Sequence, residues 1–143
     1  MGLVDRMGAS SPHFPAAELA CHHCGVNRCS QALVDALEMF RALAGKPVIV
    51  NSAYRCAQYN SQVGGAAKSQ HVEGLAADIR VMGMTAVQLE ALALRIVTIR
   101  GIGRADHGQY IHIDLRPAPT LARWCYGSDG KWCSYYPPLA EAA

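Results

Sequence analysis

Residues 109–115 constrain the fold of this chain most, because apolar and polar side chains alternate along them. The apolar members fall on one side of an extended chain, and the polar members, Tyr110, His112 and Asp114, fall on the other. This alternation predicts a β-strand with one face in the core. The opposite face then presents a phenol, an imidazole and a carboxylate to a candidate site.

Capping residues predict two longer helices. Ser30 precedes a run of apolar residues at helical spacing, which Gly45 ends. Thr85 and Gln88 form a capping box for the second helix, whose apolar face is expected to extend to Val97. Residues 54–63 are expected to form a shorter helix, and residues 14–19 a short amphipathic turn packed on the body.

Strands are predicted around the alternating segment. Residues 47–51 predict a buried strand and residues 75–81 a second one, whereas residues 101–108 are expected to be a turn-rich link. Residues 123–136 are expected to form a hairpin that turns at Asp129 and Gly130, and residues 1–13 a loose arm. The order of elements predicts an α+β fold with a small, mostly antiparallel sheet flanked by helices. The 143 residues are expected to form a single domain.

Residues 69–78 carry the second chemical feature, with His71 seven residues before Asp78. Gly74 lets the backbone turn back between them, and small residues keep the approach open. Together with His112, these side chains provide two imidazoles and one carboxylate, a set typical of catalytic zinc with a fourth position for water. The single negative charge leaves the ion net positive, so that it acidifies bound water to a pKa of about 7. The spacing alone leaves open that these are ordinary hydrogen-bonding residues.

Residues 69–78 also reproduce the S-x-H-x-x-G-x-A-x-D signature of the zinc D-Ala-D-Ala carboxypeptidases of the M15 peptidases, in their A-type subfamily. Further segments resemble that family in the same order: S-A-Y-R at 52–55, Y-N-S-Q-V-G-G-A at 59–66, G-I-G at 101–103 and Y-I-H-I-D at 110–114. The resemblance covers residues 14–116. It implies His71, Asp78 and His112 as zinc ligands, and the fold that these enzymes share with lysostaphin-type peptidases and the hedgehog signalling domain.

The resemblance also implies catalytic residues, but the chain departs from the family at the general base. Arg55 is implied to contact the substrate or the developing anion, the alternative being a surface ion pair. Many relatives carry Asp or Glu three residues before the last ligand, where this chain has Gln109, whose amide cannot take a proton from water. Hedgehog-type relatives carry a carboxylate six residues before that ligand, which makes Asp106 the preferred base. His107 is the alternative, since an imidazole with a pKa near 6.5 suits proton transfer.

Three further polar residues lie beside these candidates. Tyr110 stands where relatives often have His, and its hydroxyl either donates to an oxyanion or packs beside the metal. Asp114 shares a face with His112 and is expected to orient a ligand or an arginine rather than to bind the metal. Glu73 is expected to be a solvated surface charge.

The six cysteines allow two interpretations. One is a second, structural zinc site at Cys21-His22-His23-Cys24 with Cys29 nearby, although the spacing is tight and no distant C-x-x-C pair completes it. The simpler one is a set of disulfides, between Cys125 and Cys133 and between Cys56 and one N-terminal cysteine. Disulfides would require action outside the reducing cytosol.

Charge and hydropathy narrow the function classes. The net charge is +2, and the basic residues are scattered, so no nucleic-acid stripe is predicted. No apolar stretch is long enough for a secretion signal or a membrane span, so we expect cytoplasmic synthesis and action at the cell wall or periplasm, as in phage lysis or tail proteins. A monomer is expected.

The leading expectation is a zinc metallopeptidase that cuts peptidoglycan stem peptides, as a D-Ala-D-Ala carboxypeptidase or a lytic endopeptidase. One alternative is a zinc-containing module of hedgehog-like fold that binds cell wall or protein without catalysis, which Gln109 favours. The other is a structural cap or tail component with a vestigial site.

Overall fold

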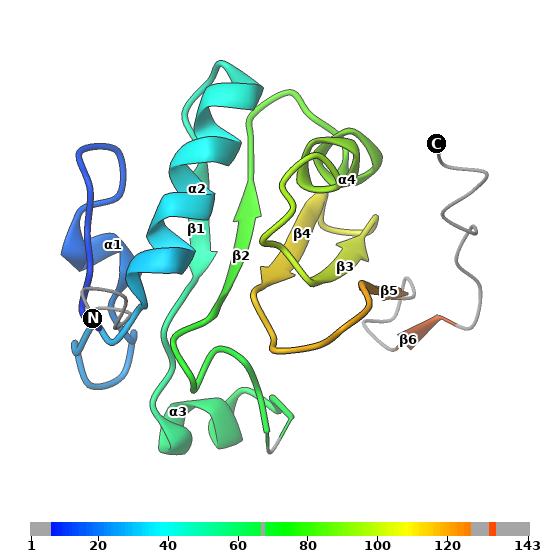
Figure 1. The fold of residues 1–143 in the computed structure, drawn as a ribbon. Helices are drawn as coiled ribbons and strands as arrows, with labels where there is room; N and C mark the ends of the chain where they lie inside the picture. The colour runs from blue at the N-terminus through cyan, green and yellow to red at the C-terminus, as the bar shows by residue number, and fades with distance from the viewer. Residues whose placement is uncertain (1–6, 67, 127–131, 134–143) are drawn as a thin grey trace.

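A mixed sheet forms the centre of the molecule (Figure 1). The computed structural model describes residues 7–66, 68–126 and the backbone of residues 132–133. In these ranges six strands pair in the order β1-β2-β4-β3-β5-β6. Their bounds are β1 Ile49–Ser52, β2 Ala76–Arg80, β3 Gly101–Ala105, β4 Tyr110–Asp114, β5 Ala122–Tyr126 and β6 Trp132–Cys133. The β3–β5 pairing is parallel and the other pairings are antiparallel, which confirms the expected α+β fold with a mostly antiparallel sheet.

Helices cover one face of this sheet and leave the other face open to a cavity. The described helices are α1 Ala16–Leu19, α2 Gln31–Ala44, α3 Ala57–Gln62 and α4 Ala86–Ala93. Helices α2 and α4 contact each other, and α4 packs on β3 and β4 (Figure 1). Their apolar side chains join Ile111 and Ile113 of β4 in one buried core. The alternate residues of β4 therefore face away from the core, as the sequence pattern predicts.

The helix caps follow the sequence closely. The Ser30 hydroxyl accepts a hydrogen bond from the Leu33 amide at 3.0 Å, and Gly45 ends α2 in the left-handed conformation. Thr85 and Gln88 form the expected capping box at the start of α4. Helix α3 is shorter than expected and has Cys56 as its N-cap.

The largest departure from the predictions is β3, because residues 101–105 form a strand where a turn-rich link was expected. The glycines of this segment do not mark turns; they make room for side chains of the neighbouring strands. A Cβ atom added at Gly101 would lie 2.4 Å from Asp114 Oδ1, and one at Gly103 would lie 2.3 Å from Trp124 Nε1. Glycine inside a strand often marks such a close approach.

Three smaller predictions are also wrong. Strand β1 is only partly buried, because it lies at the edge of the sheet. Val97 is 82% exposed rather than buried, since α4 ends at Ala93. The described part of the N-terminal arm is packed rather than loose: Ala9 is buried, and its amide donates to the Cys29 carbonyl at 3.0 Å.

The cysteines follow the predictions in part. Cys125 is disulfide-bonded, and its backbone lies opposite Cys133 in the β5–β6 pairing that the predicted hairpin requires, although the turn lies outside the described residues. Cys56 is a free thiol, so the predicted disulfide to an N-terminal cysteine is wrong. The Sγ atoms of Cys56 and Cys21 lie 3.7 Å apart, well beyond the S–S bond length of about 2.05 Å.

Within the described ranges, no helix combines the length and the apolar character that crossing a membrane requires.

Gly74 gives a test of how the loop that carries His71 is packed. Gly74 and Gly45 both have positive φ, but a Cβ atom at Gly74 would lie 2.0 Å from the Arg28 carbonyl oxygen, whereas Gly45 faces open space. Gly45→Ala should therefore cost only the left-handed backbone strain, about 1 kcal/mol. Gly74→Ala should cost on the order of 3 kcal/mol. Urea denaturation of both variants measures the difference, and equal losses would show that this loop does not pack against residue 28.

Candidate metal centre

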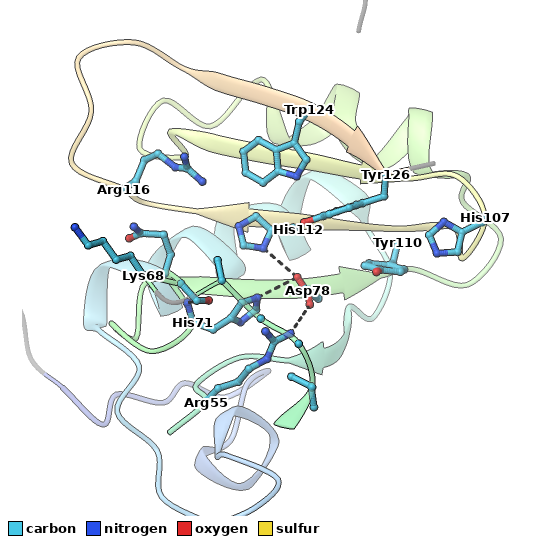
Figure 2. A pocket seen from close by; sticks show the side chains of 16 residues that line it. Arg55, Lys68, His71, Asp78, His107, Tyr110, His112, Arg116, Trp124 and Tyr126 are labelled. Atoms are coloured by element: carbon cyan, nitrogen blue, oxygen red, sulfur yellow. Dashed lines mark hydrogen bonds and ion pairs between the residues drawn. The ribbon is translucent and has the colours of Figure 1, made fainter. Parts of the chain in front are cut away.

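Three predicted side chains converge on the open face of the sheet (Figure 2). Asp78 Oδ1 lies 3.2 Å from His71 Nε2 and 3.1 Å from His112 Nδ1. Asp78 on β2 and His112 on β4 are directly opposite each other in the strand register, and His71 reaches them from the preceding loop. One donor atom of each residue lies within 4.8 Å of the other two.

The ring of His71 is fixed by a backbone carbonyl. Its Nδ1 donates to the Ala53 carbonyl oxygen at 2.7 Å, which leaves Nε2 to face Asp78. The Ser69 hydroxyl accepts from the His71 amide at 3.1 Å and holds the loop at this point. A ring nitrogen that donates to a carbonyl sets the tautomer in which the other nitrogen binds a metal.

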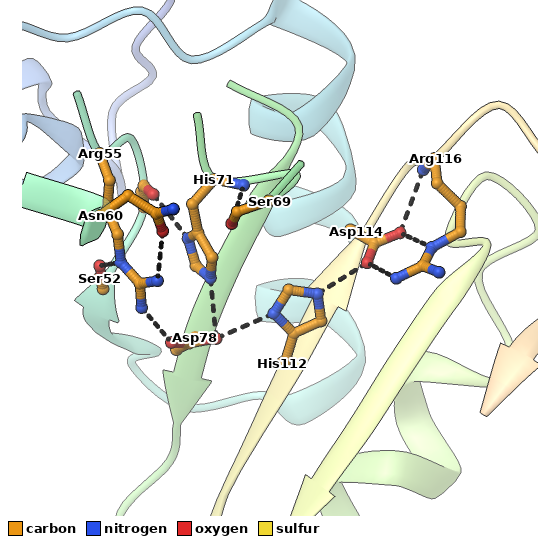
Figure 3. Close-up of polar contacts among 10 residues, drawn as sticks. Ser52, Arg55, Asn60, Ser69, His71, Asp78, His112, Asp114 and Arg116 are labelled. Atoms are coloured by element: carbon orange, nitrogen blue, oxygen red, sulfur yellow. Dashed lines mark hydrogen bonds and ion pairs between the residues drawn. The ribbon is translucent and has the colours of Figure 1, made fainter. Parts of the chain in front are cut away.

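The ring of His112 is fixed by Asp114 (Figure 3). Its Nε2 lies 2.7 Å from Asp114 Oδ2, while Nδ1 faces Asp78. Arg116 binds both oxygens of Asp114, with Nε 2.9 Å from Oδ1 and Nη2 2.8 Å from Oδ2. Asp114 thus lies where the sequence analysis expects it, behind a candidate ligand and not among the donors.

These contacts keep the carboxylates of the cluster ionised and favour the protonated form of His112. Burial alone would raise the pKa of Asp78, but hydrogen bonds from His112 and His71 hold it below its usual range. Burial would also raise the pKa of Asp114, but Arg116 and His112 lower it. For His112, burial lowers the pKa, yet the hydrogen bonds to Asp114 and Asp78 raise it to about 9. The carboxylates therefore stay ionised and favour a cation between the rings.

The donor set fits a zinc ion. Two imidazole nitrogens and one carboxylate oxygen are donors that zinc prefers, and both rings have the outer hydrogen-bond partner that orients metal-binding histidines. The carboxylate is held as well, since Arg55 Nη2 lies 3.3 Å from Asp78 Oδ2. Three protein donors leave the fourth position of a tetrahedral zinc ion open, and all three residues line the cavity.

The cavity beside these donors has a volume of about 500 Å³ and a basic lining. Arg55, Lys68 and Arg116 contribute cationic side chains to it. Arg55 is not a surface ion pair: it is mostly buried, and it also bonds Ser52 Oγ and Asn60 Oδ1, each at 3.2 Å. Such a cavity suits an anionic group bound next to the metal donors.

The sequence profile of the Peptidase M15 family matches residues 12–114, which is most of the chain and includes His71, Asp78 and His112. The chain belongs to the Peptidase M15 family. It is also similar to a curated protein of Streptomyces albus G named Zinc D-Ala-D-Ala carboxypeptidase, with 35% identity over 77 residues. That alignment covers 52% of this chain and 30% of the relative, so the chain spans less than a third of that protein.

The base candidates of this M15 chain are separated by the structure. Asp106 does not line the cavity; its side chain is 55% exposed, and its Oδ1 lies 2.9 Å from Arg104 Nε. His107 and Tyr110 do line the cavity, with their rings 6.1 Å apart (Figure 2). Gln109 has a structural role: it accepts from the Ala86 amide at 2.7 Å and donates to the Asp106 carbonyl at 2.7 Å.

Two aromatic residues of β5 also line the cavity, and the sequence analysis does not predict them. Trp124 and Tyr126 line the cavity, and the Trp124 ring lies 5.3 Å from the His112 ring. Arg116 lies 4.9 Å above the Trp124 ring, which adds a cation–π contact behind the ligand. Trp124 and Tyr126 are two residues apart on a strand, so they lie on the same face of the sheet. This spacing is the sequence signal that could have identified them as a pair.

Asp114→Asn should test the orienting role of this carboxylate. The charge that holds His112 and Arg116 is lost while all three donors remain, so zinc affinity should fall about 10–100-fold. Arg116→Gln, one contact further out, should give a smaller loss. Competition with a chromophoric chelator measures both, and Asp35→Asn, an exposed change on α2, is the control. Unchanged affinity in Asp114→Asn would remove Asp114 from the metal centre.

Proposed function

We propose that this chain is a zinc peptidase that hydrolyses peptide bonds in peptidoglycan stem peptides, as a D-Ala-D-Ala carboxypeptidase or a lytic endopeptidase. The observation that carries the proposal is the convergence of His71, Asp78 and His112 beside an open cavity. Family membership and the name of the relative support a zinc peptidase. Such a substrate places the action at the cell wall, including the phage-lysis setting that the sequence suggests.

His71, Asp78 and His112 hold the zinc in this proposal, and the ion supplies a Lewis acid and an acidified water. Arg55 donates to the second oxygen of Asp78, and its side chain lines the cavity. The fixed guanidinium stabilises negative charge that develops on the scissile carbonyl oxygen, without reorganisation during the reaction.

Tyr110 supplies a neutral donor on the same side. Burial raises the pKa of Tyr110, and the charge of Asp78 raises it further. The hydroxyl therefore keeps its proton at neutral pH and donates a hydrogen bond to a substrate or oxyanion oxygen. This favours the oxyanion role for Tyr110 over simple packing beside the metal.

The basic side chains suit a substrate with a carboxylate. Lys68 is exposed on the cavity rim and forms no ion pair with any residue in the described ranges, so its ammonium is free for an anionic group. Trp124 and Tyr126 provide flat apolar walls for small side chains. A short peptide that ends in D-alanine combines both features, which favours the carboxypeptidase form of the proposal.

His107 is the proposed base in place of Asp106. Among the described residues that line the cavity, Asp78 is the only carboxylate, and it is occupied by His71, His112 and Arg55. His107 lines the same cavity, and imidazole is the side chain used most often for proton transfer in general acid–base catalysis.

A non-catalytic binding module is the second candidate. It is favoured by the use of Gln109 and Asp106 in structural contacts, because no carboxylate other than Asp78 then lines the cavity among the described residues. A basic, aromatic cavity with a bound metal can bind an anionic cell-wall peptide without hydrolysing its peptide bonds.

Metal removal should separate the two candidates. Purified chain is incubated with sacculi, with and without chelator, and released fragments are identified by mass spectrometry. The peptidase should release D-alanine or cut cross-links, lose this activity with chelator and regain it with zinc. His71→Ala should reduce the rate at least about 1,000-fold, because one donor of three is lost. Zinc that the parent retains and His71→Ala loses, without any cleavage, would favour the binding module, and no zinc at the three donors would overturn both.

A matched pair of variants tests the base. His107→Ala should lower kcat about 100-fold or more, because the proton acceptor is lost. Asp106→Ala should stay within about threefold of the parent, since its side chain faces solvent and Arg104. Steady-state kinetics on a D-Ala-D-Ala peptide measures both, and equal rates in the two variants would remove His107 from the mechanism.

A further inference from the structure

A second group of metal-binding side chains lies outside the cavity, where residues 21–24 meet the start of α3. The Sγ atoms of Cys21, Cys24 and Cys56 all lie within 4.8 Å of one another. Cys21 is buried, Cys56 is half-buried and Cys24 is exposed. None of them is needed for the proposed peptidase chemistry, and none is in a disulfide.

The spacing of the sulfur atoms fits a tetrahedral zinc ion. A zinc–sulfur bond of about 2.3 Å places two sulfurs of a tetrahedral site about 3.8 Å apart. The Sγ atoms of Cys21 and Cys56 are 3.7 Å apart. The distance is much too long for a disulfide and matches two ligands that share one ion.

An imidazole lies beside one of the three sulfur atoms. His23 Nδ1 lies 3.8 Å from Cys56 Sγ, close to the separation of about 3.6 Å expected for nitrogen and sulfur on one zinc ion. The His23 ring is held by stacking on Tyr59, with the planes 8° apart. His22 points elsewhere, with its Nδ1 3.5 Å from the Tyr59 hydroxyl.

Backbone amides already surround the sulfur atoms as they do around thiolate ligands. The amides of His23 and Cys56 both donate to Cys21 Sγ at 3.4 Å. The Tyr59 amide donates to Cys56 Sγ at 3.4 Å. Such N–H···S bonds orient thiolates and offset part of their charge.

Cys29, which the sequence places near this group, does not belong to it. Its Sγ lies 3.6 Å from the Leu19 carbonyl oxygen, and its side chain is fully buried. Burial raises the pKa of Cys29 to about 11, so it remains a thiol. The third sulfur atom of the group belongs to Cys56, which is far away in the sequence.

We propose that Cys21, Cys24, Cys56 and His23 form a closed, structural zinc site. Four protein ligands leave no position for water or substrate, which is the form of structural rather than catalytic zinc. The ion would link residues 21–24 to Cys56, which follows Arg55 in the chain. The amide of Arg55 itself donates to the His71 carbonyl oxygen at 3.2 Å. The site therefore holds the segment from which Arg55 reaches the metal centre.

Zinc content tests the proposal on the full chain purified under reducing conditions. The parent should contain two zinc ions per chain, Cys24→Ser one, His71→Ala one, and the double variant none. Cys24 is exposed, so its loss should not disturb the core. His23→Ala should lose the second ion during dialysis, while the matched control His22→Ala should keep it.

Cobalt substitution identifies the ligands without any activity measurement. Cobalt in the His71→Ala variant should show the thiolate-to-cobalt charge-transfer band in the near ultraviolet, and Cys21→Ser with Cys24→Ser should abolish it. A disulfide among Cys21, Cys24 and Cys56 in freshly purified protein would overturn the proposal, as would a parent with one zinc that Cys24→Ser retains. If His23→Ala and His22→Ala retain zinc equally, His23 is not a ligand. These outcomes are independent of peptidase activity.

Discussion

The carboxylate of Asp78 holds the candidate site together. Oδ1 meets His71 and His112, and Oδ2 meets Arg55 at 3.3 Å. A carboxylate with only 15% of its side chain exposed keeps its charge because donors surround it. These donors come from a loop, a neighbouring strand and the segment after β1, so this one anion fixes three separate parts of the chain around the cavity.

Room for this arrangement is made by small residues on the sheet. Gly101 lies against the carboxylate of Asp114, and Gly103 lies against the indole of Trp124. A side chain at Gly101 would displace the partner that orients His112, and one at Gly103 would displace an aromatic wall of the cavity. Strand β3 therefore serves the site by having no side chains at these positions, although it contributes no ligand.

This arrangement explains which features the sequence predicts. The alternation around His112 depends on local spacing, and it predicts that His112 and Asp114 share a face. The signature around His71 is a family resemblance, and it implies the three donors. Strand β3 is not predictable in this way, because its glycines make room for Asp114 and Trp124, which belong to other strands. Which base candidates line the cavity depends on the turn before β4. In this turn Gln109 has a φ of 48°, accepts from the Ala86 amide and donates to the Asp106 carbonyl. Long-range contacts of this kind leave no periodic pattern.

The segment that carries Arg55 is held from both ends. On one side, Arg55 bonds Ser52, Asn60 and Asp78, which fixes its guanidinium beside the metal donors. On the other side, Cys56 caps α3 and lies against Cys21. A flexible arginine loses conformational entropy whenever it binds a charge, and an arginine fixed beforehand has already lost it during folding. The cysteine group therefore contributes to the site through the backbone of residues 55–56, although it lies outside the cavity and contacts no substrate.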